Sequence, residues 1–302
     1  MSKHSEPMRA GDLEVELAPE TGGSVAAFRM RTGEGWADLM RPLSEAARAR
    51  RDPIGAAMFP MVPYANRIGG NRFTFRGREY RFEANNPPER FNVHGTGWHS
   101  VWTETTLGPA ERVLELHRTG ADEPYGYRAS QRFTLAPDGL TVTMQVANSG
   151  PRAMPFGFGE HPWFLRDPDV EVRFRAGAFW LEGPDLEATE RIATPPELGF
   201  HDWKRLPAKR RNNCYADWDG VAEVRWPARG VGLRITAEPI FAHLMLYCDP
   251  TLPVFCLEPQ TNLTSAIDML ADEAEAAALG LHILEPGESV GGAMAFTPFL
   301  LA

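Results

Sequence analysis

The sequence of 302 residues contains only three cysteines, Cys214, Cys248 and Cys256. Their odd number and wide spacing argue against a disulfide framework and indicate a reducing compartment, where we expect them to be small buried hydrophobes. Charges also occupy the first 16 residues, where a secretory signal needs an apolar core, and no apolar run is long enough to span a bilayer. The sequence therefore predicts a soluble, cytoplasmic protein.

The chain has fewer basic than acidic residues, with 31 lysines and arginines against 40 aspartates and glutamates, and its net charge is −9. This balance opposes binding to nucleic acid or to an anionic membrane and favours a neutral small-molecule partner. The sequence also lacks the patterns G-x-x-x-x-G-K-[ST], G-x-G-x-x-G and G-x-S-x-G. Nucleotide hydrolysis and serine esterase chemistry are therefore poor interpretations.

Helical patterns are scarce, and only residues 44–51 and 272–279 are candidates. Alternation of apolar and polar residues, the period of a half-buried strand, recurs along most of the chain, as in residues 12–17 and 140–146. Residues 73–75 and 80–82 flank a short turn and predict a hairpin. Without repeats, low-complexity tracts or linkers, residues 1–302 are expected to form a single all-β domain, a large sandwich with long loops.

The central candidate for chemistry is His161, in the stretch Met154-Pro155-Phe156-Gly157-Phe158-Gly159-Glu160-His161-Pro162-Trp163-Phe164. Pro162 biases His161 towards an extended backbone, and Gly157 and Gly159 allow another group to come close. The alternative interpretation is a core histidine in an aromatic strand.

Two further stretches are suited to a hydroxylated ligand. In Tyr64-Ala65-Asn66-Arg67-Ile68, the guanidinium of Arg67 can hold two oxygens at once, although it can equally cap a surface turn. In His94-Gly95-Thr96-Gly97-Trp98-His99, an aromatic plane beside polar groups suits a sugar ring, although Trp98 can equally belong to the core.

Glu258 follows the apolar run Val254-Phe255-Cys256-Leu257 and precedes Pro259. A carboxylate at the end of such a run is costly to bury, so it either pairs with a buried arginine or acts as a catalytic base. A cupin-like metal site built from His94, His99, His161, Glu160 and Glu258 is an alternative. It is disfavoured because neighbours such as Glu160 and His161 point to opposite faces of a strand. We therefore expect neither a metal nor a cofactor.

Together, four motifs resemble the aldose 1-epimerase (galactose mutarotase) family in their order and spacing, and the resemblance runs from about Leu13 to Phe296. They are Asn66-Arg67-Ile68, His94-Gly95, His161-Pro162-Trp163-Phe164 and Glu258-Pro259-Gln260-Thr261. The resemblance implies a galactose mutarotase-like supersandwich, with Glu258 as general base and His161 as general acid. It also implies that His94 and Arg67 bind the sugar. We further expect Asn66, Asn212, Trp98 and Trp163 to bind the sugar or to shape its pocket.

One departure concerns Asn212, which stands where the family usually has a sugar-binding aspartate. An amide cannot accept hydrogen bonds as a charged carboxylate does, so the preferred sugar is left open. A hexose-6-phosphate epimerase remains an alternative, because the basic run from Lys204 to Arg211 can hold a phosphate or simply form a solvated loop. A non-catalytic sugar-binding protein, which needs no Glu258, is the other alternative. The oligomeric state is also open.

Overall fold

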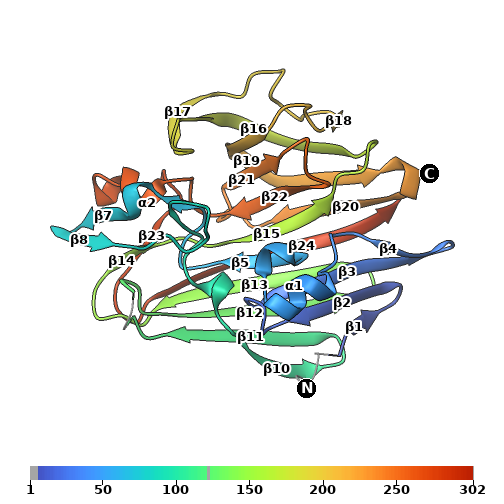
Figure 1. Ribbon diagram of the computed structural model, residues 1–302, viewed down its shortest axis with the longest axis horizontal. Helices are drawn as coiled ribbons and strands as arrows, with labels where there is room; N and C mark the ends of the chain where they lie inside the picture. The colour runs from blue at the N-terminus through green and yellow to red at the C-terminus, as the bar shows by residue number, and fades with distance from the viewer. Residues whose placement is uncertain (1–5, 121–122, 302) are drawn as a thin grey trace.

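The fold is built almost entirely from strands, in a computed structural model that describes residues 6–120 and 123–301. Eighteen strands are joined edge to edge in one continuous sheet, and three small two-stranded sheets flank it (Figure 1). The expected all-β class is confirmed. Among the described residues, no helix is long and apolar enough to span a membrane.

The large sheet consists of two groups of strands. Strands of the first group pair in the order β10 (Thr103–Gly108), β11 (Glu111–Arg118), β12 (Tyr127–Ala136), β13 (Gly139–Asn148), β24 (Ser289–Leu300) and β20 (Val231–Ala237). Strands of the second group are β1 (Met8–Ala10), β2 (Leu13–Ala18), β3 (Ser24–Thr32), β4 (Gly35–Asp38), β5 (Met58–Met61), β15 (Gly159–Leu165), β22 (Val254–Gln260) and β21 (His243–Cys248).

A long strand, β19 (Arg211–Trp226), connects the two groups. Its second half pairs with β20 and its first half pairs with β21, so it belongs to both. Outside it lie β16 (Glu171–Glu182), β17 (Ala188–Ala193) and β18 (Lys204–Arg205), at the top of Figure 1.

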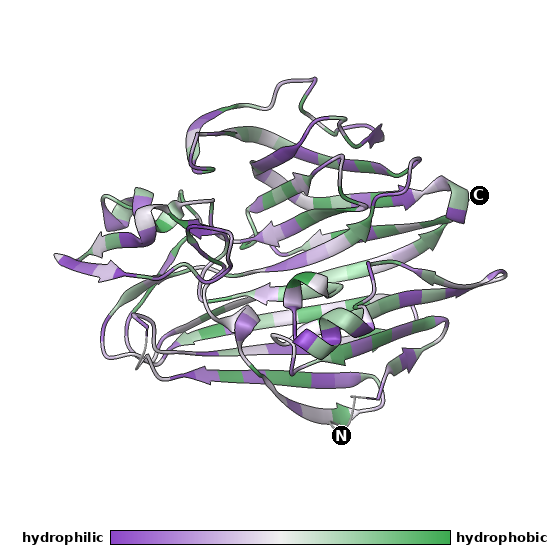
Figure 2. Cartoon of the chain, viewed as in Figure 1, coloured by the Kyte–Doolittle hydropathy of each residue, from purple (hydrophilic) through white to green (hydrophobic). Residues whose placement is uncertain are grey.

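The main core lies between the two groups of strands, as in a sandwich. One cluster of buried side chains includes Phe133 and Val142 of the first group and Phe164 and Leu257 of the second. Alternating hydrophobic and hydrophilic bands along the strands follow from this arrangement (Figure 2).

The remaining elements lie around the sheet. The hairpin of β7 (Arg72–Phe75) and β8 (Arg78–Arg81) was predicted and is confirmed. The other small pairs are β6 (Arg67–Ile68) with β9 (Asn92–Val93), and β14 (Met154–Phe156) with β23 (His282–Leu284). The 3₁₀ turns are η1 (Pro53–Gly55), η2 (Gly69–Asn71), η3 (Gly97–His99), η4 (Pro227–Arg229) and η5 (Glu273–Glu275).

One of the two expected helices is present. Helix α1 (Glu45–Arg50) begins after Ser44, whose hydroxyl accepts a hydrogen bond from the Ala47 amide at 3.2 Å. The expected helix over residues 272–279 is wrong, because only η5 forms there, and helix α2 (Ala266–Met269) lies slightly earlier instead. Alanine and glutamate favour propagation, but a stretch this short does not repay nucleation without packing.

Candidate active site

His161 and Glu258 meet on the face of the sheet that lies away from the main core. The paired strands β15 and β22 place the Nε2 atom of His161 3.4 Å from the Oε1 atom of Glu258. Both side chains are buried. The second carboxylate oxygen, Oε2 of Glu258, is also buried and has no hydrogen-bond partner among the residues described. The site therefore contains an acid–base pair with one oxygen still able to accept a hydrogen bond.

A column of stacked rings fixes the orientation of the His161 imidazole. Phe59 stacks on one side, with ring centroids 4.4 Å apart, and Trp163 stacks at 5.0 Å. Behind Phe59, Trp98 continues the column at 5.1 Å. The guanidinium of Arg41 lies 4.7 Å from the centroid of Trp163. Aromatic faces on the imidazole also stabilise its protonated form through cation–π attraction.

Burial shifts the two pKa values in opposite directions. It raises the pKa of Glu258 to about 8, although the positive charge of Arg67 acts against this rise. It lowers the pKa of His161 to about 3, and the charges of Arg41 and Arg67 act in the same direction. Near neutral pH the pair therefore holds one ionisable proton, which burial places on Glu258.

His94 adds a neutral hydrogen-bond donor to the site. Its Nδ1 accepts a hydrogen bond from the backbone N–H of Asn66 at 3.0 Å, so the proton of the neutral ring resides on Nε2. Burial holds the pKa of His94 well below its usual range. The ring lies nearly perpendicular to that of His161, with centroids 5.3 Å apart. His94 is thus suited to donate a hydrogen bond and unsuited to carry charge.

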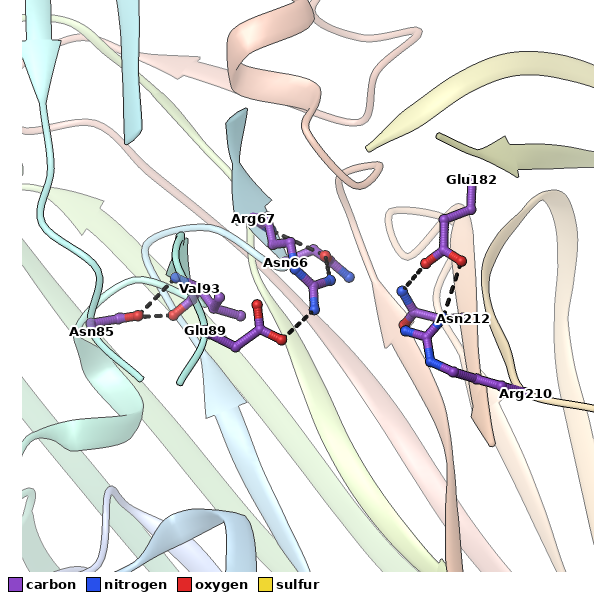
Figure 3. A network of polar contacts seen from close by, with 8 residues as sticks. All are labelled: Asn66, Arg67, Asn85, Glu89, Val93, Glu182, Arg210 and Asn212. Carbon is purple, nitrogen blue, oxygen red and sulfur yellow. Dashed lines mark hydrogen bonds and ion pairs between the residues drawn. The ribbon is translucent and has the colours of Figure 1, made fainter. Parts of the chain in front are cut away.

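Arg67 is held from two sides. Its Nη1 donates to the Asn66 side-chain oxygen at 3.2 Å, and its Nη2 lies 3.2 Å from a carboxylate oxygen of Glu89 (Figure 3). Asn66 itself has a positive φ of 64° and is almost fully buried. Asn66 therefore positions both Arg67 and His94, and we assign it a supporting role within the predicted set.

Asn212 and Arg210 both contact the carboxylate of Glu182. Nδ2 of Asn212 donates to Oε1 of Glu182 at 2.5 Å, and Nη1 of Arg210 lies 3.2 Å from Oε2 of the same carboxylate. Figure 3 draws this group in the same view as the Arg67–Glu89 pair. An acidic side chain is therefore present beside the position where the sequence has an amide.

The residues after Glu258 anchor the loop that carries Arg67. The Asn262 side chain accepts from the backbone N–H of Ala65 and donates to its carbonyl, both at 2.9 Å. Gly157 makes room for this contact, because a Cβ atom there would lie 2.0 Å from the Asn262 oxygen. Gly159 similarly lies against the backbone of Pro259. The expected close approaches to both glycines are thus made by protein groups.

Trp98 lies in a buried hydrophobic cluster with Phe59 and Trp163, as in the core alternative left open by the sequence. Its side chain is only 1% exposed, and its Nε1 donates to the carbonyl oxygens of Val93 and Gly95. Trp98 supports Phe59. Trp163 has a comparable role, because its ring is stacked on His161 and lies beneath Arg41.

Sequence reasoning missed several neighbours of the site, namely Arg41, Phe59, Glu89 and Glu182. Glu182 could have been found, since it follows the apolar run Phe179-Trp180-Leu181 just as Glu258 follows its own. Arg41 and Glu89 have no such signal, because they reach the site only through loops.

The described residues offer one potential metal-binding group, comprising His161, Cys256 and Glu258, whose ligand atoms lie within 4.8 Å of one another. This set differs from the cupin-like set named from the sequence. Glu160 points to the other face of the strand that carries His161, and the His99 ring is tilted against that of Trp98. Burial raises the pKa of the Cys256 thiol well above its usual range. A metal would have to displace protons from both Cys256 and Glu258, so the group is a poor fit for a resident ion.

A pocket of about 610 Å³ lies elsewhere, lined by Trp180, Arg191, Asp217, Trp218 and His243 among others. Arg191 and Asp217 form an ion pair within it. Because it contains no close acid–base pair comparable to His161 and Glu258, we place the candidate chemistry at the latter despite the pocket's size.

The chain is similar to several known proteins. The family model described as aldose 1-epimerase matches residues 9–297. The uncharacterized protein YphB of Escherichia coli K12 is 33% identical over 296 residues, covering 94% of this chain and 95% of that protein. The galactose mutarotase of Mus musculus is 25% identical over 216 residues, covering 64% of this chain and 61% of that protein.

A solved structure gives the same result for the fold. The crystal structure of an Escherichia coli K12 protein named as a candidate aldose 1-epimerase matches with a TM-score of 0.87 and 30% identity, covering 98% of each chain. The family match spans nearly the whole sequence, and the structural match confirms the galactose mutarotase-like fold. The chain therefore belongs to the aldose 1-epimerase family.

Proposed function

We propose that this protein interconverts the α and β anomers of a free aldose by acid–base catalysed opening and closing of the sugar ring. The observation that carries the proposal is the 3.4 Å contact between His161 Nε2 and Glu258 Oε1, on the face of the sheet that lies away from the main core. Two proton transfers are enough for this reaction, and the pair can supply both.

In the opening step, Glu258 takes the proton of the C1 hydroxyl while His161 gives a proton to the ring oxygen. The C1–O5 bond breaks with its electron pair going to O5, and a C1=O1 carbonyl forms. Rotation about C1–C2 and the reverse transfers close the ring on the other face. No proton is gained or lost overall.

The pKa shifts of His161 and Glu258 indicate which protonation state of the pair is favoured before and after ring opening. Opening begins with ionised Glu258 and protonated His161, and ends with both neutral, which is the state that burial favours. A proton must therefore pass from Glu258 to His161 before each opening, across the 3.4 Å contact. Mutual attraction and the faces of Phe59 and Trp163 stabilise the charged form that results.

His94 and Arg67 supply the remaining polar contacts. His94 donates from Nε2 to the ring oxygen or a neighbouring hydroxyl, because its Nδ1 is already occupied by Asn66. Arg67, held by Asn66 and Glu89, fixes the orientation of the sugar through its hydroxyls.

Charge pairing favours an unphosphorylated sugar over a hexose 6-phosphate. Arg67 is paired with Glu89, and Arg210 is paired with Glu182, so neither cation is left to bind a dianion. In the basic run considered from sequence, the Lys204 ammonium donates to the carbonyl oxygens of Pro196 and Gly199. These contacts support recognition of neutral hydroxyls.

Polarimetry of freshly dissolved glucose, galactose and other aldoses tests the proposal, with the buffer rate subtracted. We expect acceleration for at least one aldose and weak competition by its 6-phosphate. Binding of aldoses without any acceleration would point instead to a non-catalytic sugar-binding protein. Strong competition or turnover of a 6-phosphate alone would favour the phosphorylated substrate.

A further inference from the structure

We propose that Glu182 is a sugar-binding residue that determines which aldose is preferred, and that Asn212 acts by holding its carboxylate. This inference rests on the proposed function and identifies the wall of the site opposite Arg67. It changes the interpretation of Asn212 from a weakened sugar ligand to a positioning residue for a neighbouring acid.

The pairing of strands places Asn212 on the same face of the sheet as Glu258, two strands away. Asn212 lies opposite Tyr247 in β21, Tyr247 lies opposite Cys256 in β22, and Cys256 is two residues before Glu258. Residues paired in this way point to the same face of a sheet, as do residues two apart in one strand. Asn212 and Glu258 therefore share a face, and the hydrogen bond from Asn212 brings Glu182 to it from the end of β16.

The contacts of the carboxylate suit recognition of hydroxyl groups. Asn212 Nδ2 donates to Oε1 and Arg210 Nη1 lies beside Oε2, and these two contacts fix the orientation of the carboxylate. Each oxygen can accept a further hydrogen bond. The Glu182 side chain is 21% exposed, whereas the Asn212 residue is only 7% exposed, so the acid is the more accessible of the two.

The pairing also explains why an amide suits position 212. An aspartate there would place a second negative charge beside Glu182 and would lose the donor that holds it. Asparagine at 212 and glutamate at 182 together supply the same kind of group as a single aspartate at 212, an anionic acceptor, but from a different strand.

The Arg67–Glu89 pair, drawn with Glu182 in Figure 3, likewise combines a guanidinium with a carboxylate. A sugar between the two groups meets a carboxylate and a guanidinium on each side. This arrangement suits a ligand with hydroxyl donors and acceptors on both edges of its ring. Discrimination between epimers would then depend on which hydroxyl reaches Glu182.

The variants Glu182→Gln and Asn212→Asp test the proposal, with Glu190→Gln on the exposed part of strand β17 as a matched control for removing one charge. We expect Glu182→Gln to raise KM by about 10-fold or more for the preferred aldose, the usual scale for a charged hydrogen bond. The effect on kcat should be smaller. KM should change less for the epimer or deoxy analogue that lacks the recognised hydroxyl, whereas a merely structural defect would affect all sugars equally.

Asn212→Asp separates the two possible roles of position 212. If Glu182 is the ligand, the added carboxylate repels it and KM rises. If residue 212 binds the sugar directly, restoring the acid should lower KM, and that result would overturn the proposal. Equal KM values for Glu182→Gln and Glu190→Gln on every sugar would also overturn it.

Calorimetric titration of the same sugars distinguishes this proposal from the proposed function. Binding that depends on Glu182 without acceleration of mutarotation would support the role of Glu182 while contradicting catalysis. Acceleration of mutarotation that Glu182→Gln does not change would support catalysis and contradict the role of Glu182. Absence of both binding and turnover for all aldoses would contradict both.

Discussion

The imidazole of His161 lies with its Nε2 3.4 Å from Oε1 of Glu258, clamped between the rings of Phe59 and Trp163. The clamp limits rotation of the ring, so the distance between the two groups is set by the fold and not by a flexible side chain. Because both groups are buried, burial sets the pKa of each one. These features make the pair one functional unit in the predictions below.

Glu258→Gln and His161→Asn should each lower kcat by roughly 10²–10⁴, the usual range for a general acid or base. The double variant should be little worse than the poorer single variant, because both residues serve the same step. Steady-state rates for the three variants, with circular dichroism to confirm folding, provide the measurement. A folded Glu258→Gln variant that keeps most of its activity would contradict the role of Glu258 as base.

The pH dependence should reflect a pair that is active when it holds one proton. Loss of that proton follows the pKa of about 8 for Glu258, so kcat/KM should fall as the pH rises through about 8. Gain of a second proton follows the pKa of about 3 for His161, so little loss is expected between pH 7 and pH 5. Groups with ordinary pKa values would instead be active only between about 4.3 and 6.5. Rates at each pH, corrected for buffer catalysis, decide between these profiles, and a fall with its midpoint near pH 6.5 instead of about 8 would contradict the raised pKa of Glu258.

Arg67→Lys should raise KM more than it lowers kcat, because lysine keeps the charge but loses the planar contact with two oxygens. The substitution also removes the geometry that joins Arg67 to Asn66 and Glu89. Saturation curves with the preferred aldose measure the two constants separately. A collapse of kcat at constant KM would instead place Arg67 in the transition state.

Treatment with EDTA should leave the rate unchanged, and Cys256→Ser should retain most of the activity. The reason is that the Cys256 thiol stays protonated in its buried position and takes no part in the proposed proton transfers. The same assay after dialysis against the chelator, and for the variant, tests both statements. If EDTA abolished the activity of the native protein, and zinc restored it there but not in Cys256→Ser, His161, Cys256 and Glu258 would hold a metal.

The sequence by itself determined the fold class and the principal chemical groups. Alternating residues such as those of β13 report a half-buried strand directly, because side chains of a strand alternate between two faces. Glu258 and His161 were also recognisable, because a carboxylate at the end of an apolar run and a histidine before proline are unusual local patterns. The short α2 and the absence of a helix over residues 272–279 were not predictable, because segments of this length depend on packing.

Only the tertiary structure decided how these groups act together. Asn66 appeared as a sugar ligand in the sequence, yet its backbone N–H sets the tautomer of His94, a contact between residues 28 positions apart. Asn212 appeared as a lost acid, yet Glu182 lies beside it from a strand 30 residues earlier. The pKa values of His161 and Glu258 likewise depend on burial by distant strands. Local sequence encodes the period of a strand, but burial, charge pairing and proton positions arise only where strands meet.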